Sequence, residues 1–145
     1  TAYLATAAGT LVAVSLSTRL QRWSKDFGGP LMVAAITSSV VYLESQNRHR
    51  ISAVRLSDRS VLWTHDIEAR ATLSGLVYAP EGPSPAQILF TTQSPQVDGL
   101  PNGVTGLWAL DAMTGAVRWL DDRSTQVGGA GWASAPTSRR RPAIT

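Results

Sequence analysis

Two histidines are the first side chains of this 145-residue chain to consider as acids, bases or metal ligands. His49 stands between Arg48 and Arg50, where an anion could bind, but a solvated turn between two predicted strands accounts for it better. His65 follows Trp63 by two residues and therefore shares its strand face. Packing explains His65 better than metal binding, because no Asp, Glu or Cys partners stand at ligand spacing. We accordingly expect no metal site and no catalytic histidine.

The carboxylates are better explained as structural groups than as catalytic ones. Asp111 precedes the turn Met113-Thr114-Gly115, and its side chain can accept the backbone N–H bonds that hold such a turn. A catalytic base is the alternative for Asp111. Asp121 and Asp122 are adjacent, so on a strand they point to opposite faces and cannot work as an acid/base pair.

Two further features suggest ligands but lack a supporting motif. Asp98 and Asn102-Gly103 suggest a calcium loop, yet the alternating Asp/Asn pattern of such loops is missing. Trp108 points away from the face of its neighbour Ala109 and could stack on a ligand, although a place in the core between sheets explains it better. The chain has no Gly-rich phosphate loop and no Ser/His/Asp set at a recognisable spacing. We therefore expect no catalytic residue.

The composition indicates a folded chain and excludes several classes of protein. Hydrophobic residues make up 43% of the chain and charged residues 16%, which excludes a disordered chain. No apolar run approaches the roughly 20 residues of a membrane-spanning helix. The absence of cysteine excludes disulfides and thiolate metal sites. The net charge of +3 owes most to Arg139, Arg140 and Arg141, and no basic stripe with exposed aromatic residues predicts binding to nucleic acid.

The elements that would position these residues repeat along the chain. Three 13-residue segments align without gaps, at residues 11–23, 51–63 and 107–119. Each segment has Ala at its third position and Trp at its last. The offsets of 40 and 56 residues between the segments fit a β-sheet repeat. The longer offset has room for two enlarged loops that are rich in Pro and Gly, at 81–87 and 93–106.

Runs of β-branched and aromatic residues, bounded by Gly, Pro, Ser and Asp, predict short strands around each segment. We expect strands upstream of the three segments, and one more before each of the later two: 3–6, 40–44, 88–92, 31–36 and 72–79. Each segment adds two strands joined by a tight turn, where Gly115 can supply a positive φ. Strands such as 11–14 are apolar on both faces, as stacked sheets require. We predict an all-β chain of about three four-stranded antiparallel sheets.

The third segment resembles the tryptophan-docking motif AxDxxTGxxxW of the quinoprotein β-propellers, whose repeats are of the pyrroloquinoline-quinone-binding type. It matches the motif at every fixed position: Ala109, Asp111, Thr114, Gly115 and Trp119. The first two segments keep the motif only in part, and Arg19 and Arg59 stand at its Gly position. In that family the indole packs between neighbouring blades, so the resemblance implies a structural docking role for Trp23, Trp63 and Trp119.

The resemblance also implies a partial β-propeller, excerpted from a ring of seven or eight blades. The propeller would then span residues 1–136 of this chain, and residues 137–145 would form a basic tail or linker. The expected blades are a partial one, two complete ones and the start of another: 2–28, 29–68, 69–123 and 130–136. A chain that begins at Thr1 fits either a processed protein or a part of a longer one.

The resemblance implies a class of function more than a specific activity. We expect a non-catalytic scaffold for protein–protein interaction or assembly, similar to BamB-like repeat proteins, that binds a protein partner or the remaining blades. The alternatives are a quinone- and calcium-dependent alcohol dehydrogenase and the ligand-sensing ectodomain of a signalling protein. Pyrroloquinoline quinone and Ca²⁺ are expected only for the dehydrogenase, and many such enzymes carry a cysteine pair that this chain lacks. Only the resemblance favours an extracytoplasmic location (periplasm, secreted or ER lumen).

Overall fold

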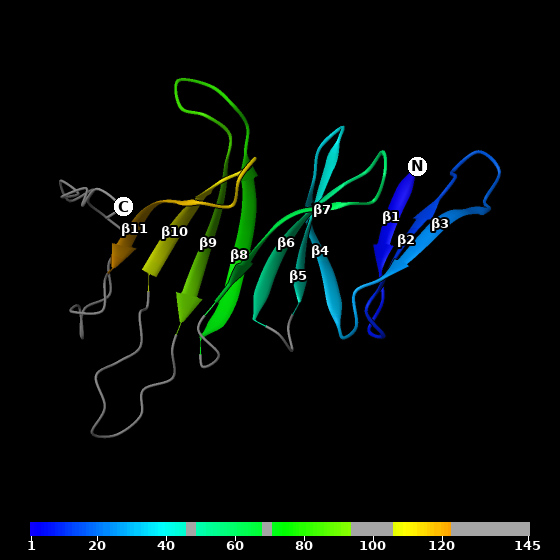
Figure 1. The fold of residues 1–145 in the computed structure, drawn as a ribbon, viewed down its shortest axis with the longest axis horizontal. Helices are drawn as coiled ribbons and strands as arrows, with labels where there is room; N and C mark the ends of the chain where they lie inside the picture. The colour runs from blue at the N-terminus through cyan, green and yellow to red at the C-terminus, as the bar shows by residue number, and fades with distance from the viewer. Residues whose placement is uncertain (46–48, 68–70, 94–105, 123–145) are drawn as a thin grey trace. The chain divides into compact units, whose positions relative to one another are not determined.

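The computed structural model describes residues 1–45, 49–67, 71–93 and 106–122, which form three antiparallel β-sheets (Figure 1). This confirms the predicted all-β class. The chain consists of two compact units, Thr1–Ala69 and Arg70–Thr145. The first unit holds two sheets and the second unit holds the third. In the described residues, no helix is long and apolar enough to span a membrane.

Each sheet is a simple meander in which consecutive strands pair. The first sheet has the order β1-β2-β3, with β1 (Ala2–Ala5), β2 (Thr10–Val14) and β3 (Gln21–Asp26). The second has the order β4-β5-β6-β7, with β4 (Leu31–Ile36), β5 (Val40–Ser45), β6 (Arg50–Arg55) and β7 (Val61–Asp66). The third has the order β11-β10-β9-β8, with β8 (Thr72–Ala79), β9 (Gln87–Gln93), β10 (Gly106–Asp111) and β11 (Val117–Asp122).

The predicted strands lie close to the observed ones, and those at 31–36 and 72–79 coincide with β4 and β8. The strand expected at 3–6 ends one residue early. Thr6 forms the turn instead, because its N–H donates to the Thr10 carbonyl and its Oγ1 accepts the Thr10 N–H, both at 3.0 Å. The expected next blade at 130–136 and the tail at 137–145 lie outside the described residues.

The three aligned segments have the same register in their sheets. Ala at the third position faces the Trp at the last position across each hairpin, and the register shifts immediately after that Ala. The facing pairs are Ala13 with Trp23, Ala53 with Trp63, and Ala109 with Trp119. Each of these alanines is fully buried. A larger side chain there would meet the indole directly, which explains why the sequence repeats Ala and Trp together.

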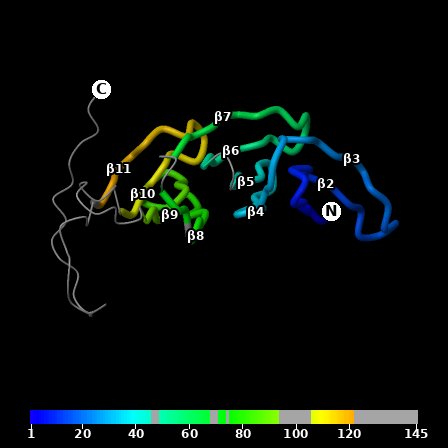
Figure 2. Tube along the Cα trace, turned by 90° about the horizontal axis from the view of Figure 1, so that it is seen from below, coloured from blue at the N-terminus to red at the C-terminus, as the bar shows by residue number. Residues whose placement is uncertain are grey.

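The core of the first unit lies between its two sheets. Leu11 from β2 packs with Val41 and Leu43 from β5 and with Val54 from β6, and all four side chains are buried. Trp23 of β3 packs against this cluster from the first sheet. Figure 2 shows the trace of β2 and β3 running beside the second sheet. One face of the first sheet therefore covers one face of the second.

One expectation about β2 is wrong. Its sequence is apolar at successive positions, which predicted burial of both faces, but only Leu11 and Ala13 are buried. Val12 and Val14 point to the other face and stay half-buried. The second sheet covers only the face that carries Leu11. The apolar run of β2 therefore includes side chains that the described part of the chain leaves half-buried.

Candidate functional site at the contact between the first two sheets

The three hairpins of the repeat share one backbone conformation although their sequences differ. The residue at the ninth position, Arg19, Arg59 or Gly115, has a positive φ of 60°, 66° and 72°, respectively. In each hairpin its N–H donates to the carbonyl of the fifth residue at 2.8–2.9 Å. Only Gly adopts this left-handed region without steric cost. The arginines therefore keep the turn of the complete motif in a strained form.

In the third hairpin the turn is held by Asp111. Its Oδ1 accepts the N–H groups of Met113 and Thr114, each at 2.9 Å, and its Oδ2 pairs with the guanidinium of Arg118. Partial burial alone would raise the pKa of Asp111. The bonds from Arg118, Thr114 and Met113 outweigh this effect and leave the pKa of Asp111 below its ordinary value. The carboxylate is thus fully engaged in holding its own turn.

In the second hairpin the carboxylate comes from a different position of the repeat. Asp58 stands where the third segment has Thr114, and its Oδ1 accepts the Ser60 N–H at 2.9 Å and the Ser60 hydroxyl at 2.7 Å. Arg55 stands where the third segment has Asp111 and donates to the other oxygen of Asp58 at 3.1 Å. The bonds from Ser60 and then from Arg55 lower the pKa of Asp58 to about 2. The two hairpins thus reach the same turn with different carboxylates.

In the first hairpin no carboxylate takes part. Ser15 occupies the Asp position, where its hydroxyl accepts the Thr18 N–H at 3.4 Å and lies 3.1 Å from the Ser17 hydroxyl. These contacts are longer and neutral, so they stabilise the turn less than the charged bonds of the other two hairpins.

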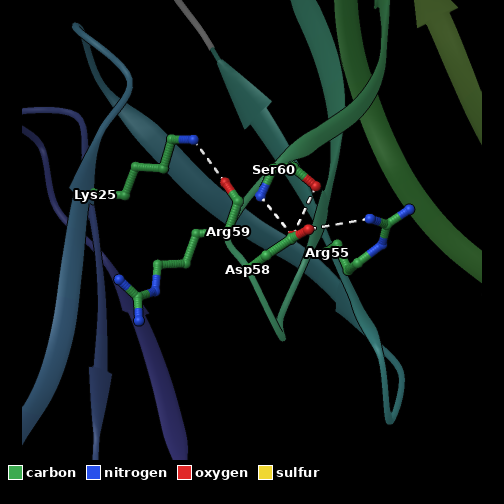
Figure 3. Close-up of polar contacts among 5 residues, drawn as sticks. All are labelled: Lys25, Arg55, Asp58, Arg59 and Ser60. Carbon is green, nitrogen blue, oxygen red and sulfur yellow. Dashed lines mark hydrogen bonds and ion pairs between the residues drawn. The ribbon is translucent and has the colours of Figure 1, made fainter.

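The turn of the second sheet contacts the indole of the first sheet. The guanidinium of Arg59 lies over the ring of Trp23, 5.7 Å from its centroid. The ammonium of Lys25, two residues further along β3, donates to the Arg59 carbonyl at 2.6 Å (Figure 3). Figure 3 also shows Asp58 between Ser60 and Arg55, directly beside Arg59. The contacts of Arg59 with Trp23 and Lys25 therefore hold its strained turn against the first sheet.

Three aromatic pairs form within single sheets. Trp23 lies 5.9 Å from Tyr3, and Trp63 lies 6.0 Å from Tyr42, with tilted rings in both pairs. Trp108, which could have stacked on a ligand, is stacked on Phe90 at 5.9 Å. Its Nε1 donates to the Thr92 hydroxyl at 2.9 Å. The indole of Trp108 is therefore anchored by β9, the strand next to its own.

Solved structures place this arrangement among known folds. BamB from Moraxella catarrhalis, a β-propeller protein, is similar with a TM-score of 0.55 and 21% sequence identity over 83% of this chain. The likeness covers 33% of the BamB chain, so this chain spans about a third of that protein's length. No family model matches the sequence, and no curated protein matches it significantly.

This chain has the fold of part of a β-propeller. The likeness extends to the fold alone at this level of identity. The sheets of the chain are accordingly called blades below, in the order in which they occur in the sequence. The strand order of these sheets and the register shared by their hairpins agree with the predicted fold class.

One of the two histidines lies in a turn and the other on a strand. His49 has a positive φ of 46° in the turn between β5 and β6, and its carbonyl accepts the Ile67 N–H at 2.6 Å. His65 lies half-buried on β7, and burial lowers its pKa while the nearby Asp66 carboxylate acts in the opposite direction. Among the described residues, no three His, Cys, Asp or Glu side chains gather in a way that could hold a metal ion.

Sequence reasoning missed Glu44, a carboxyl buried in the inner strand β5. Only 7% of the residue is exposed, and its neighbours in the register are Met32 on β4 and Ile51 on β6. Burial raises the pKa of Glu44 above its ordinary value. The one available signal was its place at the end of the apolar run 40–43.

Of the other predicted features, two aspartates lie on β11 and the rest lie outside the described residues. Asp121 and Asp122 pair in register with Leu107 and Gly106, in the last two positions of β11. The calcium-loop residues, most of the loop 93–106 and the basic cluster lie outside the described residues: Asp98, Asn102-Gly103, residues 94–105 and Arg139–Arg141.

Proposed function

We propose that this chain is a non-catalytic propeller scaffold that binds a protein partner through the tips of its hairpins. The observation that carries the proposal is the exposure of large apolar side chains on hydrogen-bonded turns. Leu20 in the first hairpin is 67% exposed and Met113 in the third is 69% exposed. Exposed apolar side chains that form one surface are a feature of protein-binding sites.

The hydrogen bonds that hold the turns support a binding role. Met113 donates its N–H to Asp111, and the carbonyl of Leu20 accepts the Ser15 N–H at 2.9 Å. A partner that binds a side chain on a fixed turn orders less of the protein than one that binds a loose loop. The likeness to BamB adds support at the level of the fold alone, because one fold can carry unrelated functions.

The test is affinity capture with the full protein and variants of the two tips. We expect the double variant Leu20→Ser/Met113→Ser to recover at least about tenfold less of a specific partner, since each buried apolar side chain at an interface contributes about 1.5 kcal/mol or more. Ser57→Ala is the matched control, because Ser57 occupies in the second hairpin the place that Met113 has in the third. Equal recovery with both variants would contradict the proposal.

The same protein can be tested for the alternative chemistry. The full-length protein is mixed with pyrroloquinoline quinone, Ca²⁺ and alcohols, and reduction of a dye is followed. The scaffold proposal predicts a rate equal to that of the quinone and Ca²⁺ without protein. Dye reduction that depends on both the protein and the alcohol would replace the scaffold with a dehydrogenase.

A further inference from the structure

The connection from the first blade to the second runs against the β1–β2 turn of the first blade (Figure 1). The Phe27 N–H donates to the Gly9 carbonyl at 2.8 Å, and the Leu31 N–H donates to the Thr6 carbonyl at 3.4 Å. Phe27 follows β3, and Leu31 is the first residue of β4. The two bonds therefore join the start of the second blade to a turn of the first.

Two glycines meet in this contact. A Cβ on Gly9 would lie less than 3.0 Å from the backbone N, C and O of Gly29, closer than real Cβ atoms approach other atoms. Gly9 also has a φ of 94°, a conformation that residues with a Cβ rarely adopt. The connection can therefore lie on the turn only because Gly9 has no side chain. We call residues 6–9 and 27–31 the blade clamp.

Both segments of the blade clamp are held in shape by bonds of their own. The Thr6 carbonyl also accepts the Gly9 N–H, and the Thr6 Oγ1 accepts the Thr10 N–H, each at 3.0 Å. In the connection, the Gly28 N–H donates to the Oδ1 of Asp26 at 2.8 Å. The clamp thus joins two shaped segments mainly through their backbones, so few side chains lose rotamer freedom when it closes.

One hydrogen bond of the clamp recurs 40 residues further on, without the glycines. The Ile67 N–H donates to the His49 carbonyl at 2.6 Å, as Phe27 does to Gly9. His49 also has a positive φ, and Ala69 stands 40 residues after Gly29 in the sequence. The repeat therefore does not require glycine at these two positions, and the close glycine contact is particular to the connection between the first two blades.

The blade clamp and the Arg59 contact lie at opposite ends of the second blade. Leu31 pairs with Ser45, and Ser45 pairs with Arg50, the first residue of β6. The turn that carries Arg59 follows the last residue of the same strand. Strands β4 to β7 are paired in sequence between these ends, so the sheet links the clamp to the Arg59 turn.

We infer that the blade clamp sets how the second blade stacks on the first, and that the Arg59–Trp23 contact forms only when the clamp is closed. Close-packed faces have few alternative arrangements, so a shift of the connection on the Gly9 turn moves the whole second blade. The Arg59 turn then leaves the indole. The inference goes beyond the proposed function, because it concerns a conformational device within the chain and requires no partner.

The test compares Gly9→Ala with Gly75→Ala in the full chain. Both variants add one methyl group at a positive φ, 94° for Gly9 and 65° for Gly75. A Cβ on Gly75 meets no atom beyond its chain neighbours within 4 Å, so Gly75→Ala adds backbone strain without overlap and is the matched control. Thr6→Val is a milder variant of the clamp, because it removes only the hydroxyl that accepts the Thr10 N–H.

Hydrogen exchange and NMR report on the two ends of the second blade separately. In the wild type we expect the Phe27 amide to exchange slowly and the Arg59 side chain to show nuclear Overhauser effects to Trp23. Gly9→Ala should lose both signals while the amides within β5 and β6 stay protected, which shows that the blade is folded. Thr6→Val should speed exchange at Phe27 and weaken the Overhauser effects together, and Gly75→Ala should keep both signals.

Three results would overturn the inference. The first is an Arg59–Trp23 contact that persists in Gly9→Ala after the Phe27 amide has lost its protection, because the two ends would then be independent. The second is unchanged protection of Phe27 in Gly9→Ala, since the glycine contact would then be dispensable. The third is loss of both signals in Gly75→Ala, which would reflect a general loosening of the fold. If Gly9→Ala does not fold, Thr6→Val decides, and a change at only one of the two ends overturns the inference.

Discussion

The guanidinium of Arg59 lies 5.7 Å from the centroid of the Trp23 ring, so the turn of the second blade contacts the indole of the first. Arg59 stands where the complete docking motif has Gly. Gly would relax the backbone at this position but would leave the indole without its cation. The sequence departs from the motif at a place where the replacement side chain makes a new contact.

The first prediction concerns the balance between strain and contact at Arg59. Arg59→Ala should lower the free energy of unfolding by about 0.5–1 kcal/mol, because it removes the cation–π contact and keeps the strain. Arg59→Gly should be close to neutral, because it also relieves about 1 kcal/mol of left-handed strain. Urea unfolding measures both differences.

Arg19 provides the internal control for this prediction, since it has a similar φ and no described indole beneath it. Arg19→Gly should raise the free energy of unfolding by about 1 kcal/mol. If Arg19→Gly and Arg59→Gly stabilise the protein equally, the contact with Trp23 contributes nothing.

The second prediction concerns acid and Asp58. The pKa of Asp58 is about 2 in the folded protein and 3.8 ordinarily. A lowered pKa stabilises the fold fully above the ordinary value, and this stabilisation is lost as the pH falls from about 4 towards 2. The difference in unfolding free energy between wild type and Asp58→Asn should therefore shrink over that window. A difference that stays constant from pH 5 to pH 2 would show that the Asp58 charge makes no contribution.

The third prediction concerns the turn of the third blade. Asp111→Ala should lower the free energy of unfolding by about 1–3 kcal/mol, because it removes the acceptor for two backbone N–H groups. It also leaves Arg118 without its described carboxylate, and the Nε of Arg118 is already buried without a described partner. Asp111→Asn should cost less, since its amide oxygen can still accept the bonds from Met113 and Thr114. Thermal unfolding of the two variants compares them, and equal losses would mean that the turn bonds are unimportant.

Much of the fold could be predicted from the sequence because the repeat carries its own register. Trp at the last position and Ala at the third face each other in all three hairpins, so the repeated spacing corresponds to one repeated hairpin register. The strands at 31–36 and 72–79 followed from apolar runs with clear boundaries.

The site was less predictable, because it depends on contacts between segments that the sequence does not relate. Arg59 looks like a loss of the motif until the fold brings Trp23 beneath it. Likewise, the unbroken apolar run of β2 could not show which of its faces would be covered. Glu44 follows a run of apolar residues on its strand, and no periodicity in the sequence marks its side chain as buried.

The fourth prediction concerns Glu44. Burial raises its pKa, so the folded protein favours the protonated acid. This preference is fully present below the ordinary pKa of 4.5 and is lost as the pH rises through the raised value. Glu44→Gln should therefore gain stability relative to wild type as the pH rises from 4 to 7, by about 1 kcal/mol or more at the upper end. Unfolding at a series of pH values tests this, and a relative loss at pH 7 would mean that the carboxylate has a stabilising partner.

The most direct test of the contact between blades is an NMR measurement on the side chains of Arg59 and Trp23. The ring current of an indole shifts protons above its face upfield, so the Arg59 δ protons should resonate upfield of those of Arg19 and show nuclear Overhauser effects to Trp23. Replacement of Trp23 by Leu should return the Arg59 shifts to those of Arg19. Arg59 shifts that match Arg19 in the wild-type protein, with no Overhauser effect to the indole, would contradict the packing of the second blade on the first.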